Sequence, residues 1–488
     1  MTFLPKISSP SRKAIAVLAA LAAWSLACGG LRAPDLGRLY NRPAQHHGLE
    51  RNPVIVIPGI LGSKLVDAES GKLVWGAFFG GGARPQTPEG ARFAALPMRR
   101  GAELDELRDG VVSDGVLERF KIKLVGLRIQ MKAYIGILSA LGAGGFRDED
   151  LQIPSIDYGD DHFTCFQFDY DFRRDNVENA RRLHDFILER RAFVLDQQRQ
   201  RFGAANEDLK FDVIAHSMGG LILRYYLRYG DADLAADGSP PAITWAGARH
   251  VAKAVLISPP NAGGTEALSF LVEGRRFGRI GPRYDAAVLS TYPSMFQLLP
   301  RVRHQPVIDE SSGQTVDFMD PKSWEDYGWG LADPAQDRIL EILLDGVADP
   351  GERRRVAIDH LRKSLVRARR FHAALDVPAA PPAGTDLYLM AGDAIDTPKV
   401  LAVDRRGGLR VTSRAEGDGR VLRSSALMDE RIGHSWLPTL SSPIDWTHVT
   451  FLFREHLDIT HDPVFTDNLL YLLLEAPASP RRTTAPVL

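Results

Sequence analysis

The stretch of residues 210–227 constrains the fold of this chain more than any other. Its first part, Phe211–Ile214, has the composition of a short buried strand, and Leu221 and Tyr225 then recur at helical spacing. Ser217 lies between the two, flanked by small residues. A serine at such a sharp strand-to-helix turn has a strained backbone and presents its hydroxyl at the edge of a sheet. The pattern predicts a nucleophile elbow.

The residues around Ser217 leave one alternative to the elbow. Ala215 stands where the usual Gly-x-Ser-x-Gly pattern has its first glycine, and Gly219 keeps the second. Alanine is small enough for a strand and a helix to approach closely. An ordinary turn with a capping serine is the alternative, because such turns favour serine. The run of small residues at the most crowded point favours the elbow.

Charge and composition exclude some partners. The 488 residues include 60 Lys and Arg against 61 Asp and Glu, so no excess of positive charge favours nucleic acid. A hydrophobic content of 44% is typical of a chain that buries a core, and the length fits one large domain with insertions. No spacing of cysteines and histidines indicates a metal site, and we expect no cofactor.

The amino end has the pattern of a bacterial export signal over residues 1–27. Basic residues precede an apolar run, residues 14–27, that is shorter than the roughly 20 residues of a membrane-spanning helix. Residues 25–28 resemble a lipobox, which predicts lipid modification of Cys28; plain cleavage beside an incidental cysteine is the alternative. Cys165 would then have no disulfide partner and would be a buried small residue. We expect an exported protein of the cell envelope, anchored by lipid in the periplasm or at the outer membrane.

The remaining chain alternates between apolar runs and helical segments. Residues 28–50 are rich in Gly, Pro, Arg and His and predict a flexible tether before a folded domain of residues 51–488. Alternating strands and helices predict a mostly parallel sheet with helices on both faces, the α/β-hydrolase arrangement. Residues 267–380 do not continue this alternation of strands and helices, and they predict a mostly helical cap or lid. Its apolar stretch, residues 295–299, fits either a lipid substrate or the core of the cap itself.

Two further segments between the first strand and the elbow carry predictions. Residues 75–118, which include the run Phe78–Gly82, are rich in Gly and Pro and predict a long irregular excursion. Met131, Tyr134 and Leu138 have the spacing of a core-facing helix.

An oxyanion hole is predicted from the loop after the first strand, residues 53–57. Pro58 has no N–H and Gly59 is needed for the turn, so the N–H of Ile60 is the predicted first donor. Met218, the residue after the nucleophile, supplies the second. The alternative is that Pro-Gly only ends the strand.

A general base is predicted just beyond the carboxyl end of a strand. His456 meets this condition, because it follows the predicted last strand, residues 449–453. His448, at the other end of that strand, and His461, nearer the final helix, are the weaker candidates.

Position alone leaves two candidates for the carboxylate that orients the histidine. Asp393 directly follows a strand, and Asp418 follows a hairpin predicted over residues 400–411. Both fit ordinary turn aspartates as well. Asp171 and Arg173 form a further pair, either of a site or of a buried structural ion pair.

Five segments in the same order resemble the lecithin:cholesterol acyltransferase family, which includes lysosomal phospholipase A2 and phospholipid:diacylglycerol acyltransferases. They are Pro58–Leu65, Tyr170–Arg173, Ala215–Gly220, Gly417–Gly419 and His456. The resemblance runs through most of residues 51–475. It implies an α/β-hydrolase that moves an acyl chain from a lipid ester to a lipid alcohol or to water. In that family the acid lies in a Gly-Asp-Gly segment after an extra hairpin, which favours Asp418 over Asp393.

This chain departs from the family at Arg420, where threonine is usual, and at Phe172, where tryptophan is usual. The mammalian disulfides of the family have no counterpart.

We therefore expect a lipoprotein-type enzyme, an O-acyltransferase or lipase, with Ser217 as nucleophile, His456 as general base and Asp418 as its orienting acid. Its partners would be a lipid ester, a lipid alcohol acceptor and a membrane surface. A non-catalytic lipid-binding or scaffold lipoprotein of the same fold is the alternative from another class, and a peptidase is a third.

Overall fold

Six parallel strands form the main sheet, in a computed structural model that describes residues 35–76, 84–117, 119–124, 127–132, 134–150, 162–235, 238–276, 281–432 and 437–477. In sheet order they are β16 (His448–Leu452), β13 (Asp386–Gly392), β9 (Val251–Ile257), β8 (Phe211–His216), β1 (Val54–Ile57) and β7 (Cys165–Gln167). β1 and β8 are buried along their whole length, since a parallel strand inside the sheet is covered on both faces. Their apolar composition follows from this burial.

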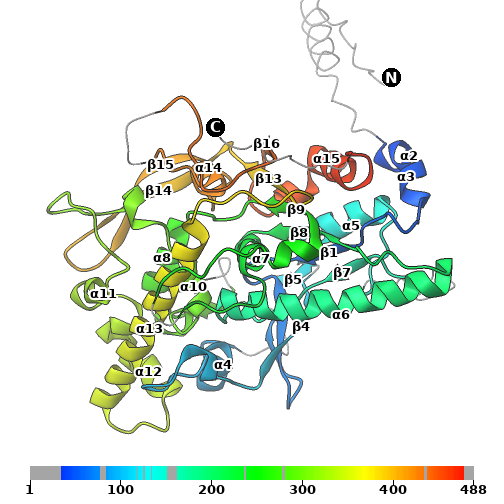
Figure 1. Ribbon diagram of the computed structural model, residues 1–488. Coiled ribbons are helices and arrows are strands. Elements are labelled where there is room, and N and C mark those ends of the chain that lie inside the picture. Colours follow the sequence, from blue (N-terminus) through cyan, green and yellow to red (C-terminus); the bar gives the residue numbers. More distant parts are fainter. Residues whose placement is uncertain are drawn as a thin grey trace, which may run out of the picture.

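Helices cover both faces of the sheet (Figure 1). On one face α6 (Asn176–Phe202) packs against α7 (Met218–Tyr229), and on the other α5 (Ile135–Ala143) packs against α15 (Pro463–Leu474). These two layers confirm the predicted α/β architecture. Among the described residues, no helix has the length and apolar composition needed to cross a membrane.

The segment between β1 and α5 is more regular than its Gly- and Pro-rich sequence predicts. It contains the antiparallel strands β2 (Ser63–Asp67), β3 (Leu73–Trp75) and β4 (Val111–Val116), the helix α4 (Pro88–Ala94) and the hairpin of β5 (Arg119–Leu124) and β6 (Leu127–Lys132). Met131 lies in β6 opposite Phe120, so the helix predicted to include it begins only at Ile135. The spacing of Tyr134 and Leu138 is helical, but Met131 pairs with the neighbouring strand instead. The run Phe78–Gly82 lies outside the described residues.

The segment between β9 and β13 is mostly helical, as predicted. It contains α8 (Thr265–Glu273), α9 (Ala286–Leu289), α10 (Pro293–Gln297), α11 (Pro321–Tyr327), α12 (Asp337–Leu343) and α13 (Pro350–Asp376), with the short strands β10 (Arg275–Arg276), β11 (Arg283–Tyr284) and β12 (Val307–Asp309). Phe296 and Leu299 are fully buried, and the Phe296 ring packs 5.5 Å from Trp324 between ring centroids. The apolar stretch 295–299 is therefore core of this segment.

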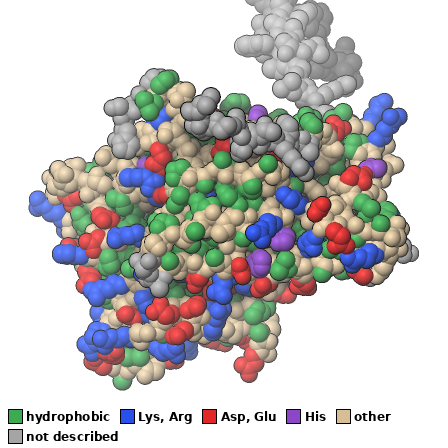
Figure 2. Space-filling view, in the orientation of Figure 1, with side chains coloured by type: hydrophobic (Ala, Val, Ile, Leu, Met, Phe, Trp, Pro, Cys, Tyr) green, Lys and Arg blue, Asp and Glu red, His purple; other side chains and the backbone are tan. Residues whose placement is uncertain are grey.

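The arginine-rich helix α13 carries a balanced surface rather than a basic one. Arg354 pairs with Asp337, Arg355 with Glu352 and Arg362 with Glu325. Figure 2 shows acidic and basic side chains mixed over α12 and α13, at the bottom of the view. Such mixed charge gives no single-sign field on this face.

A hairpin follows β13 directly. Its strands β14 (Ile395–Val403) and β15 (Leu409–Gly417) pair antiparallel, and the turn at Gly407 has a positive φ of 80°. This hairpin extends beyond the predicted one, residues 400–411, at both ends. It ends at Gly417, and the short helix α14 (Arg423–Leu427) comes after it.

The prediction of a flexible tether over residues 28–50 is wrong for residues 35–50. Here the helices α2 (Leu36–Leu39) and α3 (Asn41–Gln45) lie against the domain, and Tyr40 between them is 3% exposed. The Tyr40 hydroxyl donates to Asp467 of α15 at 2.7 Å. One buried aromatic side chain thus outweighs a composition that is typical of linkers. The predicted signal peptide, residues 1–27, and the lipidation site Cys28 lie outside the described residues.

Candidate active site

Ser217 lies at the turn between β8 and α7 with strained backbone angles, φ 53° and ψ −124°. Its N–H donates to the carbonyl of Ile257 in the neighbouring strand at 2.8 Å. The two glycines that follow are needed for close packing, because a Cβ on Gly219 would lie 2.4 Å from the carbonyl oxygen of Pro58 and one on Gly220 would lie 2.9 Å from Pro259. This is the geometry of a nucleophile elbow.

His456 links the serine to a carboxylate. Its Nε2 lies 3.0 Å from Ser217 Oγ, and its Nδ1 lies 2.7 Å from Asp418 Oδ2. All three side chains are buried, with exposed fractions of 7% for Ser217, 6% for His456 and 2% for Asp418. Because a carboxylate only accepts, Nδ1 carries the proton and Nε2 is free to accept the serine proton.

Asp418 is held as an anion in this position. Burial opposes its charge, but the neighbouring His456 and hydrogen bonds from His456, Val421 and Arg420 hold the pKa of its carboxyl below the usual value. Its Oδ1 accepts from the backbone N–H of Val421 at 2.7 Å and of Arg420 at 3.0 Å. The residue at position 420 contributes through its backbone, so an arginine is compatible with this role.

The other sequence candidates lie elsewhere. Asp393 has Arg423 as its ionic neighbour, with 3.8 Å between Oδ2 and Nε. His448 begins β16 and is exposed, at the far end of the strand from His456. His461 ends a 3₁₀ turn, where its Nδ1 lies 3.4 Å from the Thr460 hydroxyl. The structure thus brings together the favoured trio and none of these three.

The loop of residues 58–62, hereafter the oxyanion loop, lies directly against Ser217. A Cβ on Gly59 would lie only 2.7 Å from Ser217 Cβ. In the described part of the chain, the amides of Ile60 and Met218 have no hydrogen-bond acceptor. Met218 is the first residue of α7, where an N–H has no partner within the helix. Ile60 therefore follows the glycine that lies against Ser217, Met218 follows Ser217 directly, and both amides are available as donors.

His216 and Tyr134 belong to this region, although the sequence did not assign them a role. The Tyr134 hydroxyl lies 3.2 Å from His216 Nδ1 and accepts from the Gly59 N–H at 2.7 Å. His216 Nε2 lies 3.1 Å from the carbonyl oxygen of His456. Tyr134 precedes α5 and was predicted only as part of an apolar stripe. The sole sequence signal for His216 is its place beside Ser217.

Asp171 and Arg173 form a structural ion pair. The Arg173 guanidinium is 1% exposed and lies 2.8 Å from Asp171 and 2.9 Å from Asp109. It also donates to backbone carbonyls of residues 93–95, so it ties the end of α4 to the turn between β7 and α6. These contacts satisfy a buried charge, and they decide between the two alternatives that the sequence left open.

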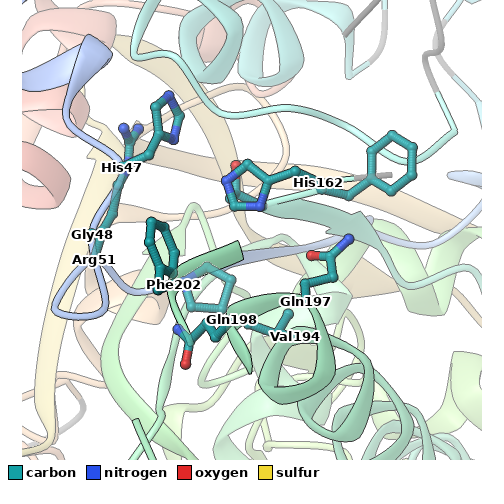
Figure 3. A pocket seen from close by; sticks show the side chains of 11 residues that line it. His47, Gly48, Arg51, His162, Val194, Gln197, Gln198 and Phe202 are labelled. Carbon is teal, nitrogen blue, oxygen red and sulfur yellow. The ribbon is translucent and has the colours of Figure 1, made fainter. Parts of the chain in front are cut away.

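A small cavity of about 20 Å³ lies at the opposite end of the sheet, before the first residues of β1 and β7. The labelled side chains of His47, His162 and Gln197 point into the same space (Figure 3). His47 is half-buried, and burial followed by the nearby Arg51 lowers the pKa of its imidazole to about 4. Among the described residues, no cluster of three or more His, Cys, Asp or Glu side chains could hold a metal ion.

Comparisons with known proteins find similar solved structures but no matching family model or curated protein. No protein-family model matches the sequence. A search of curated proteins also finds no match. Among solved structures, the chain is similar to one in the crystal structure of the Tle4–Tli4 complex, with a TM-score of 0.55 and 15% identity over 87% of this chain and 98% of that one.

Two looser likenesses carry no argument, because their TM-scores are below 0.5. Phospholipase PlaB from Legionella pneumophila has a TM-score of 0.30 and 15% identity over 66% of this chain and 53% of that one. EstA from Clostridium botulinum has a TM-score of 0.33 and 12% identity over 89% of this chain and 90% of that one.

The parallel sheet, the elbow between β8 and α7, and the likeness to the Tle4–Tli4 structure show that this protein has the α/β-hydrolase fold.

Proposed function

We propose that the protein transfers the acyl chain of a lipid ester, through an acyl-enzyme on Ser217, to a lipid alcohol or to water. The observation that carries this proposal is the unbroken line of hydrogen bonds from Ser217 through His456 to Asp418. A serine hydroxyl is a weak nucleophile unless a base accepts its proton, and the carboxylate fixes the tautomer of that base.

The reaction follows from this geometry. Ser217 Oγ attacks the ester carbonyl carbon while His456 Nε2 takes the serine proton. The N–H groups of Ile60 and Met218 stabilise the negative oxygen of the tetrahedral intermediate. When the intermediate collapses, the bond to the leaving alcohol breaks and His456 returns the proton to it, which leaves the acyl group on Ser217. An acceptor hydroxyl then gives its proton to His456 and attacks the acyl carbon. When this second intermediate collapses, the bond between the acyl carbon and Ser217 Oγ breaks and His456 returns the proton to Ser217.

A lipid substrate is supported by two observations besides the family resemblance. Phe453 is 78% exposed and lies three residues before His456 in the sequence, directly after β16. An exposed phenylalanine suits contact with a lipid aggregate, because moving its apolar ring from water into lipid is favourable. The amino-terminal signal pattern, with its lipobox at Cys28, would place the enzyme at a membrane.

A fluorophosphonate probe tests the chemistry directly. We expect labelling of Ser217 in the wild-type protein and none in His456→Ala, which lacks the base. A folded wild-type protein that is not labelled would contradict the enzyme and favour the non-catalytic lipid-binding lipoprotein.

The acceptor is tested with vesicles of mixed phospholipid and sterol, whose products are analysed by mass spectrometry. Acyl-sterol or another acyl-alcohol identifies a transferase, and free fatty acid identifies a lipase. If neither product forms while Ser217 reacts with the probe, the substrate lies outside this lipid class. That result would favour the peptidase alternative.

The anchor is tested separately by metabolic labelling with an alkyne fatty acid in a bacterial host. We expect label on the wild-type chain at the membrane and its loss in Cys28→Ser. Equal membrane association of both proteins without label would refute lipidation.

A further inference from the structure

Three buried aromatic side chains hold the peptide groups of the oxyanion loop. They are Tyr170, whose hydroxyl donates to Pro58 O at 2.8 Å, Trp75, whose indole N–H donates to Leu61 O at 2.8 Å, and Tyr134, whose hydroxyl accepts from Gly59 N–H at 2.7 Å. Ile60 stands between these fixed peptides. Its N–H therefore has little freedom to turn away from Ser217.

Tyr134 differs from the other two because it also contacts the histidine side of the site. Its hydroxyl meets His216 Nδ1, and His216 Nε2 meets the carbonyl oxygen of His456. A carbonyl oxygen only accepts, so His216 carries its proton on Nε2 and its Nδ1 is an acceptor. The Tyr134 hydroxyl must then donate to His216 while its oxygen accepts from Gly59. Each hydrogen bond from Gly59 to His456 therefore has only one possible donor and one possible acceptor.

The line keeps its direction during turnover. His216 is 2% exposed, and burial together with the nearby His456 lowers the pKa of its imidazole to about 3. His216 therefore stays neutral when His456 takes up the serine proton. A buried network whose donors and acceptors are all matched is rigid, because any rotation leaves a polar group unpaired.

We propose that Tyr134 and His216 are positioning residues that couple the oxyanion loop to the backbone of His456. Neither side chain reaches the reacting atoms. Together they hold the Ile60 amide and the His456 imidazole in one fixed relation, so that the oxyanion donor and the proton acceptor are aligned before substrate arrives. This inference rests on the proposed function.

The Tyr134→Phe variant removes the oxygen at the centre of the line while the ring keeps its packing. We expect kcat for 4-nitrophenyl butyrate to fall about 10- to 100-fold, less than for outright loss of an oxyanion donor, with KM within about twofold. The sharper readout is the ratio of kcat/KM for this ester to that for its thionoester. Sulfur is a poor hydrogen-bond acceptor, so a misplaced oxyanion donor slows the oxygen ester more and lowers the ratio. A smaller fraction of folded enzyme slows both esters equally.

Tyr229→Phe is the matched control. Its buried hydroxyl also donates to a backbone carbonyl, Ala374 O at 2.8 Å, but at the far end of α7 from Ser217. We expect an unchanged ratio for this variant. A ratio that falls equally in Tyr134→Phe and Tyr229→Phe would overturn the coupling.

His216→Gln completes the test. The glutamine amide nitrogen can replace Nε2 and keep the bond to His456, but nothing replaces Nδ1 as partner of Tyr134. We expect this variant to lose no more activity than Tyr134→Phe, which also frees the Gly59 N–H, and the double variant to be no worse than Tyr134→Phe alone, since the bond between Tyr134 and His216 is already absent from it. Additive losses would refute the bridge. A wild-type protein that hydrolyses neither ester would refute the proposed function, whereas an active wild type with an unchanged ratio in Tyr134→Phe would refute only the positioning role.

Discussion

Two pairs of imidazoles lie at opposite ends of the main sheet, and they differ in how their nitrogens are bound. At the carboxyl ends, the rings of His216 and His456 are 4.7 Å apart between centroids, and each of the four nitrogens has a partner. At the amino ends, His47 and His162 are 5.6 Å apart, and His47 Nδ1 has no partner among the described residues.

The contrast shows what distinguishes a candidate active site from a cavity that contains unpaired polar groups. Complete pairing fixes the tautomer and ring orientation of His456, which a general base requires. The Gln197 amide in the other cavity is also buried without a partner in the described part of the chain. A cavity of about 20 Å³ has room for water, which can satisfy such groups without fixing them.

The strongest test makes the same substitution at both ends. His456→Ala should lower kcat/KM for a soluble ester at least about a thousandfold, because the serine loses its base. His47→Ala should stay within about twofold of wild type. Steady-state hydrolysis measures both. A comparable loss from His47→Ala would mean that the amino-end pair takes part in the reaction.

The second test compares the two aspartates that were candidates for the acid, Asp418 and Asp393. Asp418→Ala should also lower kcat/KM at least about a thousandfold, though less than loss of the base, since only the orientation of His456 is lost. Asp393→Ala should have little effect, because Asp393 faces Arg423. The reverse pattern in the same hydrolysis assay would identify Asp393 as the acid.

A third substitution separates chemistry from contact with lipid. Phe453→Ser should lower turnover of phospholipid vesicles about tenfold, since burial of one phenylalanine in a lipid surface is worth roughly 1.5–3 kcal/mol at most. Turnover of a short soluble ester should not change, because the triad is untouched. Equal losses on both substrates would place Phe453 in the active site rather than at a lipid contact.

The smallest expected effect is that of His47, at the amino ends of the strands, on the pH dependence of Tm. Folded His47 has a pKa of about 4 and the unfolded side chain about 6.5, so the unfolded chain binds the proton first as the pH falls from 6.5 towards 4. This stability contribution is present above pH 6.5 and is lost through that window. The His47→Gln variant, which does not titrate, should reduce the drop in Tm between pH 7 and pH 5 by about 1–2 °C. An unchanged drop would mean that His47 is solvated in the folded protein.

Much of the candidate site followed from the sequence because its parts are local. The strand, turn and helix around Ser217 lie within one short stretch, and His456 directly follows a strand. Asp418 was harder, since its distance from His456 depends on how the hairpin of β14 and β15 folds back. Only the resemblance to a family separated it from Asp393.

Long-range contacts account for what the sequence did not predict. Tyr40 is fixed by Asp467, a residue at the other end of the chain, so linker-like composition was misleading. Tyr134 has the spacing of an ordinary core residue, and its role depends on one hydroxyl that meets both Gly59 and His216. No periodicity in the sequence encodes such a meeting.

The backbone angles of Ser217 have an evolutionary consequence. A non-glycine residue at φ 53° and ψ −124° costs of order 1–3 kcal/mol, whereas the flexibility of glycine in the unfolded chain costs only about 0.5–1 kcal/mol. A lineage that used this fold only to hold lipid would gain stability by drifting to glycine at position 217. In this chain serine stands at that position despite the thermodynamic disadvantage, as expected where the hydroxyl is in use.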